Sequence, residues 1–140
     1  MTKFLKTHLP QIARISLGII FCVSGINFVY RIFPIDYSPE GASFIENLKS
    51  FGYVWPVLKI TELLCGLMLI FGYFGPLALF ILAPITLGIV LFHVLLSSGA
   101  DAILGYSVFV LEVFLIFYFR SHFTHVFRDF FNDVEKDKVV

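Results

Sequence analysis

Long apolar runs separated by short polar breaks occupy most of this chain. Four runs, at about residues 11–32, 54–73, 75–98 and 102–120, are long enough to span a membrane, since a spanning helix needs roughly 20 apolar residues. Between the second and third runs, "FGYFGP" contains a Gly75-Pro76 pair that predicts a tight turn. Between the third and fourth, "SSGAD" places Asp101 as the expected N-cap of the last span. An even number of spans puts both termini on one side of the membrane.

Two further segments have the pattern of amphipathic helices outside the spans. In "SPEGASFIENLKSFG", Ser38 is the expected N-cap and Pro39 the first helical residue. The apolar side chains of this segment share one face, which predicts a short extracytoplasmic amphipathic helix on the membrane surface, between the first two spans. After the last span, residues 121–140 repeat phenylalanine and valine at helical spacing, which predicts an amphipathic C-terminal tail along the interface.

The sequence therefore predicts an all-α polytopic membrane protein, a four-transmembrane-helix bundle that forms a single domain over residues 1–140. Composition agrees, because 59% of the residues are hydrophobic, only 14% are charged, and the mean hydropathy is +0.91. Ten basic residues balance ten acidic ones, so no charge excess indicates a nucleic-acid partner.

The basic residues also predict the orientation of the chain. They flank the start of the first span and the end of the last, so the positive-inside rule predicts cytoplasmic N- and C-termini in the cell (inner) membrane. The first apolar run is too long for a typical signal-peptide core, and no small-x-small cleavage site follows it. We expect it to remain as the first transmembrane helix.

Few polar side chains lie within the spans. A charge at mid-bilayer costs about 2.5–3.5 kcal/mol, so such groups are expected to face protein, water or a ligand. Counting the helical rise places Glu62 roughly 3 Å, Asn27 roughly 8 Å and His93 roughly 10 Å from the midplane, on the side away from the termini. We therefore predict that Glu62 and His93 lie within one hydrogen bond, or one bridging water, of each other.

Helix periodicity extends this polar cluster. Lys59 lies one turn from Glu62, and Thr86 shares a face of the third span with His93. The candidate ligand-binding residues are Ser24, Asn27, Lys59, Glu62, Thr86 and His93. Glu112 and Arg14 are secondary candidates: Glu112 has no polar neighbour on its own face, and Arg14 has the position of a snorkelling anchor.

The alternative to a ligand site is a purely structural role, in which Glu62 and His93 form a hydrogen-bonded pair that holds two helices together. The sequence is about equally compatible with the two interpretations. Catalytic and metal-binding sites are not predicted. A C-x-x-C motif, a P-loop, a dinucleotide fingerprint and an H-E-x-x-H motif are all missing, and His93 is the one histidine at depth, which disfavours bis-histidine haem. Cys22 and Cys65 are expected to be small buried residues, and Gly18, Cys22 and Gly25 form a small-residue stripe that predicts a close helix contact.

The motifs of this chain, in their order, resemble the DoxX family over about residues 11–120. In the family pattern, an arginine precedes the first span and a small-Gly-x-Asn element lies within that span. The second span contains a glutamate and a glycine four residues later. The third span contains a proline and, later, a Phe-His pair. The matching residues are Arg14, Gly25, Asn27, Glu62, Gly66, Pro84, Phe92 and His93. The chain departs from the pattern at Phe28, where many DoxX-like sequences have a basic residue or histidine, so a site that uses this residue in relatives would be altered here.

The resemblance implies a four-helix membrane fold and an association with quinone-linked or other redox complexes, while more distant relatives act as assembly chaperones or cargo receptors. Two hypotheses follow. In the first, the chain is a redox-associated membrane subunit that holds a quinone or similar lipophilic small molecule near Glu62 and His93. In the second, it is a non-enzymatic binding or assembly-chaperone module that holds another membrane protein or a second copy of itself. An enzyme acting alone is not expected.

Overall fold

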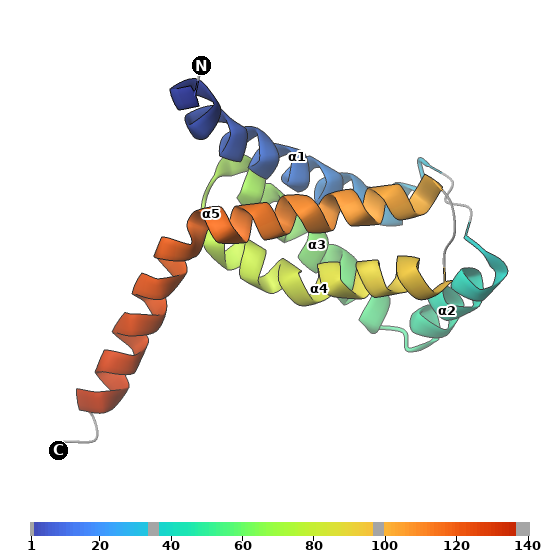
Figure 1. Cartoon of the computed structure of the whole chain (residues 1–140). Coiled ribbons are helices and arrows are strands. Elements are labelled where there is room, and N and C mark those ends of the chain that lie inside the picture. Colours follow the sequence, from blue (N-terminus) through green and yellow to red (C-terminus); the bar gives the residue numbers. More distant parts are fainter. Residues whose placement is uncertain (1, 34–36, 97–99, 137–140) are drawn as a thin grey trace.

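The computed structural model describes residues 2–33, 37–96 and 100–136, which form five helices (Figure 1). These are α1 (Thr2–Tyr30), α2 (Pro39–Ser50), α3 (Val54–Phe71), α4 (Gly75–Leu96) and α5 (Ala100–Lys136). Four segments are long and apolar enough to cross a membrane: His8–Tyr30, Val54–Phe71, Gly75–Leu96 and Ala102–Ser121. The predicted all-α fold with four membrane spans is confirmed, with boundaries that differ by at most three residues among the described positions.

The four long helices form a ring in which α1 packs against α3, α3 against α4, α4 against α5, and α5 against α1. The short helix α2 crosses one end of the ring and contacts α3 and α4 (Figure 1). We call this the α2 end; the opposite end, where α3 turns into α4, is the turn end. The described beginning of α1 and the last turns of α5 both lie toward the turn end, as an even number of spans requires.

The contact between α1 and α3 depends on small residues from both helices. A Cβ atom added at Gly18 would lie 2.8 Å from the Gly66 carbonyl oxygen, and one added at Gly66 would lie 2.8 Å from the Gly18 carbonyl oxygen. Farther along, a Cβ atom at Gly25 would lie 2.8 Å from Leu63 Cβ. The predicted close helix contact is therefore present, and the partner of α1 in it is α3. The two backbones can come this near because the residues at the contact are glycines.

The connection between α3 and α4 is as short as predicted but is placed differently. Gly72 caps α3 in the left-handed conformation (φ 78°) and donates its N–H to the Met68 carbonyl, and Phe74 also has a positive φ of 53°. Gly75 and Pro76 start α4 instead of forming the turn. The reason is that proline fits the first turn of a helix, where its missing N–H costs nothing, so the left-handed positions fall on the residues before it.

Both ends of α5 bear on the predictions. Asp101 is not the N-cap of the last span, because α5 already begins at Ala100; the side chain of Asp101 and residues 97–99 lie outside the described part. The C-terminal tail is helical as far as Lys136, because α5 continues into it without a break, and its last turns leave the bundle at an angle (Figure 1). That this segment lies along the membrane interface stays a prediction, and residues 137–140 are not described.

The buried apolar core lies toward the turn end. It is formed by side chains that are almost fully enclosed, among them Leu17, Leu69, Leu79, Leu82 and Leu115. Toward the α2 end the side chains of the same four helices instead border a cavity. The turn end therefore supplies a packed base that holds the helices around this cavity.

Candidate functional site

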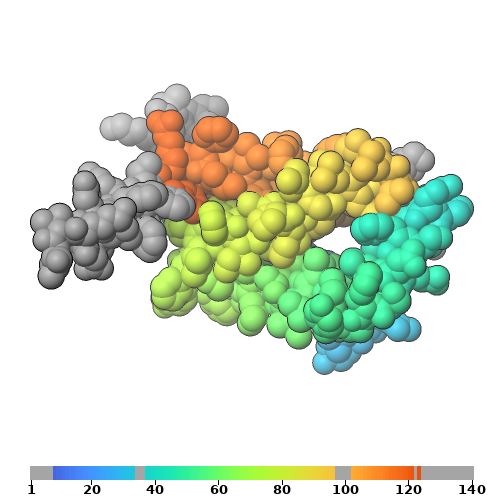
Figure 2. Space-filling model, turned by 90° about the horizontal axis from the view of Figure 1, so that it is seen from below, coloured from blue at the N-terminus to red at the C-terminus, as the bar shows by residue number. Residues whose placement is uncertain are grey.

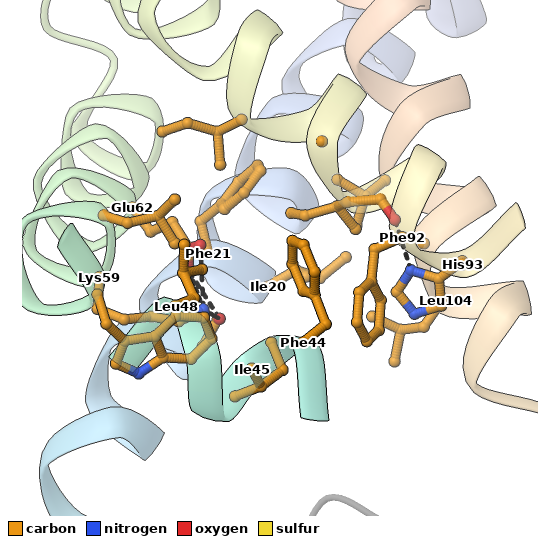
Figure 3. A pocket seen from close by; sticks show the side chains of 18 of the residues that line it. Ile20, Phe21, Phe44, Ile45, Leu48, Lys59, Glu62, Phe92, His93 and Leu104 are labelled. Carbon is orange, nitrogen blue, oxygen red and sulfur yellow. Dashed lines mark hydrogen bonds and ion pairs between the residues drawn. The ribbon is translucent and has the colours of Figure 1, made fainter. Parts of the chain in front are cut away.

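The cavity at the α2 end has a volume of about 760 Å³ and is bordered by side chains from all five helices (Figure 3). Its walls are mainly apolar, with Phe21 and Val108 nearest the packed core and Phe44 and Leu48 of α2 on the opposite side. Figure 2 shows an opening into the molecule bounded by α2 (cyan to teal), α3 (green) and α4 (yellow). A volume of this size falls within the range of small-molecule sites, roughly 300–1,000 Å³.

A closed polar cluster occupies one side of the cavity. The Ser24 hydroxyl of α1 donates to Glu62 Oε2 over 2.7 Å. The Lys59 ammonium donates to Ser24 Oγ (2.9 Å) and to Glu62 Oε1 and Oε2 (3.0 and 2.8 Å). Glu62 is 1% exposed and the Lys59 side chain 13% exposed. Such a pair is tolerated away from water because each charge faces its counter-ion and is hydrogen-bonded as well.

His93 of α4 lies on the other side of the cavity. Its Nδ1 is 2.7 Å from the Ile89 carbonyl oxygen, and because a carbonyl can only accept, Nδ1 carries the hydrogen. In the neutral imidazole, Nε2 is then a hydrogen-bond acceptor. The ring fits against α5 at Gly105, where a Cβ atom would lie 2.8 Å from Nδ1. The hydrogen bond to Ile89 and the close fit against Gly105 of α5 therefore hold the imidazole ring in one orientation.

The structure shows no direct hydrogen bond between Glu62 and His93; the other form of the prediction, one bridging water, stays a prediction. The hydrogen bonds of Glu62 go to Ser24 and Lys59, and that of His93 goes to Ile89. Both residues line the cavity, and Figure 3 shows them on opposite sides of it, with apolar side chains between. The physical reason is that Glu62 finds a counter-ion one turn away on its own helix, whereas His93 is separated from it by the cavity.

Helix α2 covers the cavity and is attached to α4. Ser38 caps α2 as predicted, accepting from the Gly41 N–H over 3.1 Å, and its hydroxyl also donates to the Leu96 carbonyl at the end of α4. The ring of Phe92 on α4 contacts Phe44 of α2, with centroids 5.7 Å apart. The apolar side chains Phe44, Ile45 and Leu48 of this amphipathic helix line the cavity. Its extracytoplasmic position stays a prediction.

Thr86 and Glu112 form a separate buried pair between α4 and α5. Thr86 is fully buried and Glu112 is 2% exposed, and the Thr86 hydroxyl is near enough to interact with the Glu112 carboxyl. However, Thr86 Oγ1 and Glu112 Oε1 have no hydrogen bond of normal geometry to any described group. Neither residue lines the cavity. Thr86 therefore does not join His93, and Glu112 has a polar neighbour that the sequence reasoning missed, because that neighbour is on another helix.

Asn27 and Arg14 also lie outside this cavity. The Asn27 amide donates to the Phe33 carbonyl (3.0 Å) and accepts from the Phe33 N–H (2.7 Å), so it closes the chain just after α1. The Arg14 guanidinium fills the space beside Gly72, where a Cβ atom would lie 2.1 Å from Nη1. A cation next to the last carbonyls of α3 is favourable because the C-terminal end of a helix carries partial negative charge. Asn27 thus shapes the α2 end, and Arg14 the turn end.

The two cysteines, Cys22 and Cys65, are buried and free, as expected. Within the described ranges, no three His, Cys, Asp or Glu side chains gather in a way that could hold a metal ion. The described residues offer the cavity an ion pair, the hydroxyl groups of Ser24 and Tyr37, the indole of Trp55 and an imidazole. These groups can bind and orient a ligand through hydrogen bonds.

Comparison with known proteins gave one match. The model of the DoxX family matches residues 9–95, more than half of the chain, from the start of the first span through nearly all of α4. This segment includes Ser24, Lys59, Glu62 and His93 but not Glu112. No match was found among curated proteins or among solved structures.

Proposed function

Because the chain belongs to the DoxX family of integral membrane proteins, we propose that it is a redox-associated membrane subunit that binds a quinone or a similar lipophile in the cavity at the α2 end. The observation that carries the proposal is a cavity of about 760 Å³ with apolar walls and with polar groups on two opposite sides. A ring with an oxygen atom at each end, such as a quinone headgroup, matches that distribution of groups.

The hydrogen-bond geometry favours the reduced form of such a ring. Since His93 Nδ1 already donates to Ile89, the neutral imidazole presents Nε2 as an acceptor, which suits an O–H group. On the other side, the Glu62 carboxylate can accept from an O–H group, while the Lys59 ammonium, which has three N–H groups, can donate to a carbonyl. A quinol thus finds an acceptor on each side, whereas a quinone finds donors on one side. Electron transfer to or from the ligand is assigned to a partner protein.

A lipophile can reach this cavity from the bilayer. The opening between α2, α3 and α4 lies on the side of the bundle (Figure 2). Gly88 and Pro84 of α4 line the cavity and are themselves exposed, and a Cβ atom at Gly88 would meet nothing within 4 Å. An apolar tail could therefore remain in the lipid while the headgroup occupies the cavity.

Trp55 allows a direct test, because it lines the cavity and is the sole tryptophan of the chain. The full chain, purified in mild detergent, is titrated with a short-chain quinol and with the corresponding quinone while tryptophan fluorescence is followed. Gly88→Phe places a ring where the glycine leaves open space, and Leu87→Phe adds the same ring at the neighbouring exposed position. We expect saturable quenching in the wild type and in Leu87→Phe, and its loss in Gly88→Phe. Equal quenching in both variants would refute the site.

His93→Leu separates a ligand role from a structural one. If His93 binds the ligand, the variant unfolds at the same temperature as the wild type or higher, because a polar group has left an apolar setting, and it loses quinol binding. If His93 has only a structural role, the variant loses the hydrogen bond to Ile89, is less stable by about 0.6 kcal/mol, the typical value for an intramembrane hydrogen bond, and binds normally. Thermal unfolding and quinol titration on the same sample decide between the two.

The alternative is a non-enzymatic assembly-chaperone module that holds a protein partner or a second copy of the chain. It is favoured by α5, which continues to Lys136 and whose last turns leave the bundle at an angle (Figure 1). Native mass spectrometry of the protein from mild detergent distinguishes the proposals. A bound quinone supports the first, and a stoichiometric protein partner without a quinone supports the second.

A further inference from the structure

A second cavity, with a volume of about 660 Å³, adjoins the first and differs from it in charge. Three basic side chains line it: Arg31, just after α1, Lys49 near the end of α2, and Lys59 in α3. We propose that this cationic pocket binds the phosphodiester headgroup of an anionic phospholipid. The inference does not depend on which ligand occupies the apolar cavity.

The charge balance of the pocket supports an anionic ligand. Among the described residues that line it, none is acidic. Lys59 is compensated by Glu62, the one ion pair found among the described residues, whereas Arg31 and Lys49 have no ion-pair partner there. Arg31 and Lys49 are also exposed, so they can reach a headgroup without first leaving a buried contact. The described part of the pocket thus carries about two uncompensated positive charges, and one phosphodiester would neutralise half of them.

Two of these cations contact the ring of Trp55. The Lys49 Nζ lies 5.7 Å and the Lys59 Nζ 5.0 Å from the centre of the indole ring, a distance at which cations are attracted to the ring face. An anion bound in the pocket beside this ring would be attracted by both ammonium groups. The indole therefore helps to hold two ammonium groups at the wall of the pocket, where a phosphate could contact them.

The position of the pocket favours a lipid over a free anion. The first span ends at Tyr30 and the second begins at Val54, so Arg31 and Trp55 lie where the apolar spans meet the headgroup layer. Tryptophan and tyrosine are typical of this level. The pocket also shares Ser24, Tyr37, Trp55 and Lys59 with the apolar cavity, so the acyl chains of a lipid bound here would have apolar surface beside them.

Trp55 again provides the reporter. The full chain in mixed micelles is titrated with phosphatidylglycerol that carries brominated acyl chains and, separately, with brominated phosphatidylcholine, and the quenching of tryptophan fluorescence is compared. Arg31→Gln and Lys49→Gln, alone and together, each remove one charge from the pocket. Arg120→Gln removes the same kind of charge from an exposed position at the turn end and is the matched control. Inorganic phosphate is added as a competitor in a further series.

We expect the wild type and Arg120→Gln to prefer phosphatidylglycerol. Each single pocket variant should lower that preference by about fivefold. This is the change in the binding constant that corresponds to the loss of one basic side chain near a membrane surface. Equal quenching by both lipids in the wild type, or a preference that survives in the double variant, would overturn the proposal. Displacement of the lipid by millimolar inorganic phosphate would also overturn it, since the site would then be one for a free anion.

The outcome can be told apart from that of the quinol titration. Arg31 and Lys49 do not line the apolar cavity. If the quinol site is real, a quinol should therefore quench the tryptophan fluorescence of the Arg31→Gln and Lys49→Gln variants as it does in the wild type. Gly88→Phe should, conversely, keep the preference for phosphatidylglycerol, because Gly88 does not line the cationic pocket. Native mass spectrometry of retained lipid gives a second readout that is independent of changes in the indole environment.

Discussion

The close approach of α1 and α3 can be tested by adding a single methyl group. In Gly66→Ala, the new Cβ atom would lie 2.8 Å from the Gly18 carbonyl oxygen, 2.8 Å from Cys22 Sγ and 2.9 Å from the Cys22 backbone nitrogen. Two of these three neighbours are backbone atoms, which cannot rotate away as the end of a flexible side chain could. The clash must therefore be relieved by moving α1 away from α3.

The cost follows from the distances. Restoring an ordinary contact of about 3.4 Å requires a local separation of about 0.6 Å, and a gap of that size forfeits a quarter to a half of the dispersion energy of each affected contact. Overpacking of this kind costs about 1–3 kcal/mol. Alanine also favours the helix over glycine by up to about 1 kcal/mol. Gly88→Ala gains the same helix preference without a clash, because its Cβ atom meets nothing within 4 Å. The difference between the two variants therefore isolates the packing cost.

The measurement is reversible unfolding in mixed micelles of increasing SDS content, followed by circular dichroism. We expect Gly88→Ala to be as stable as the wild type or up to about 1 kcal/mol more stable. Gly66→Ala should be less stable than Gly88→Ala by about 1–3 kcal/mol. If the two alanine variants unfold at the same SDS content, the close α1–α3 contact does not exist as described and the reasoning is refuted.

Two further substitutions test the polar cluster and the cover of the cavity. Lys59→Met leaves the buried Glu62 carboxylate without its counter-ion and should lower the free energy of unfolding by about 3–5 kcal/mol, whereas Lys59→Met combined with Glu62→Leu should regain most of that loss in the same SDS assay. A double variant no more stable than the single one would contradict a role for the ion pair. Ser38→Ala removes the N-cap of α2 and the hydrogen bond to the Leu96 carbonyl. The variant should lose about 1 kcal/mol of unfolding free energy and exchange its amide hydrogens faster over residues 39–50. Unchanged exchange there would show that α2 is held by other contacts.

Much of the fold was predictable because its signals are local. The length of each apolar run sets the spans, since a helix must satisfy its own backbone hydrogen bonds to cross lipid. Ser38 followed by Pro39 predicted the start of α2, because both residues act through their own backbone neighbours. The turn before α4 was misplaced by a few residues, since proline suits a helix start as well as a turn and Gly72 had to take the left-handed position instead.

The candidate site was predictable only where its members share a helix. Lys59 and Glu62 lie one turn apart on α3, so their ion pair could be read from spacing alone. Ser24 was a candidate, but its bond to Glu62 requires that α1 and α3 be neighbours. The hydrogen bond of His93 goes to its own helix at Ile89, and no spacing rule distinguished that outcome from a pair with Glu62.

The sequence by itself determined that this chain is a four-span membrane protein with a capped short helix and a small-residue face on α1, because hydrophobic length and helical period act within one segment. Only the tertiary structure decided which helices meet and how far apart they stand. It packed Gly18 against Gly66, brought Thr86 to Glu112, and kept His93 apart from Glu62 across a cavity. Contacts between helices depend on how each helix is rotated about its axis and on the angle at which two helices cross. The spacing of residues along one helix determines neither the rotation nor the crossing angle.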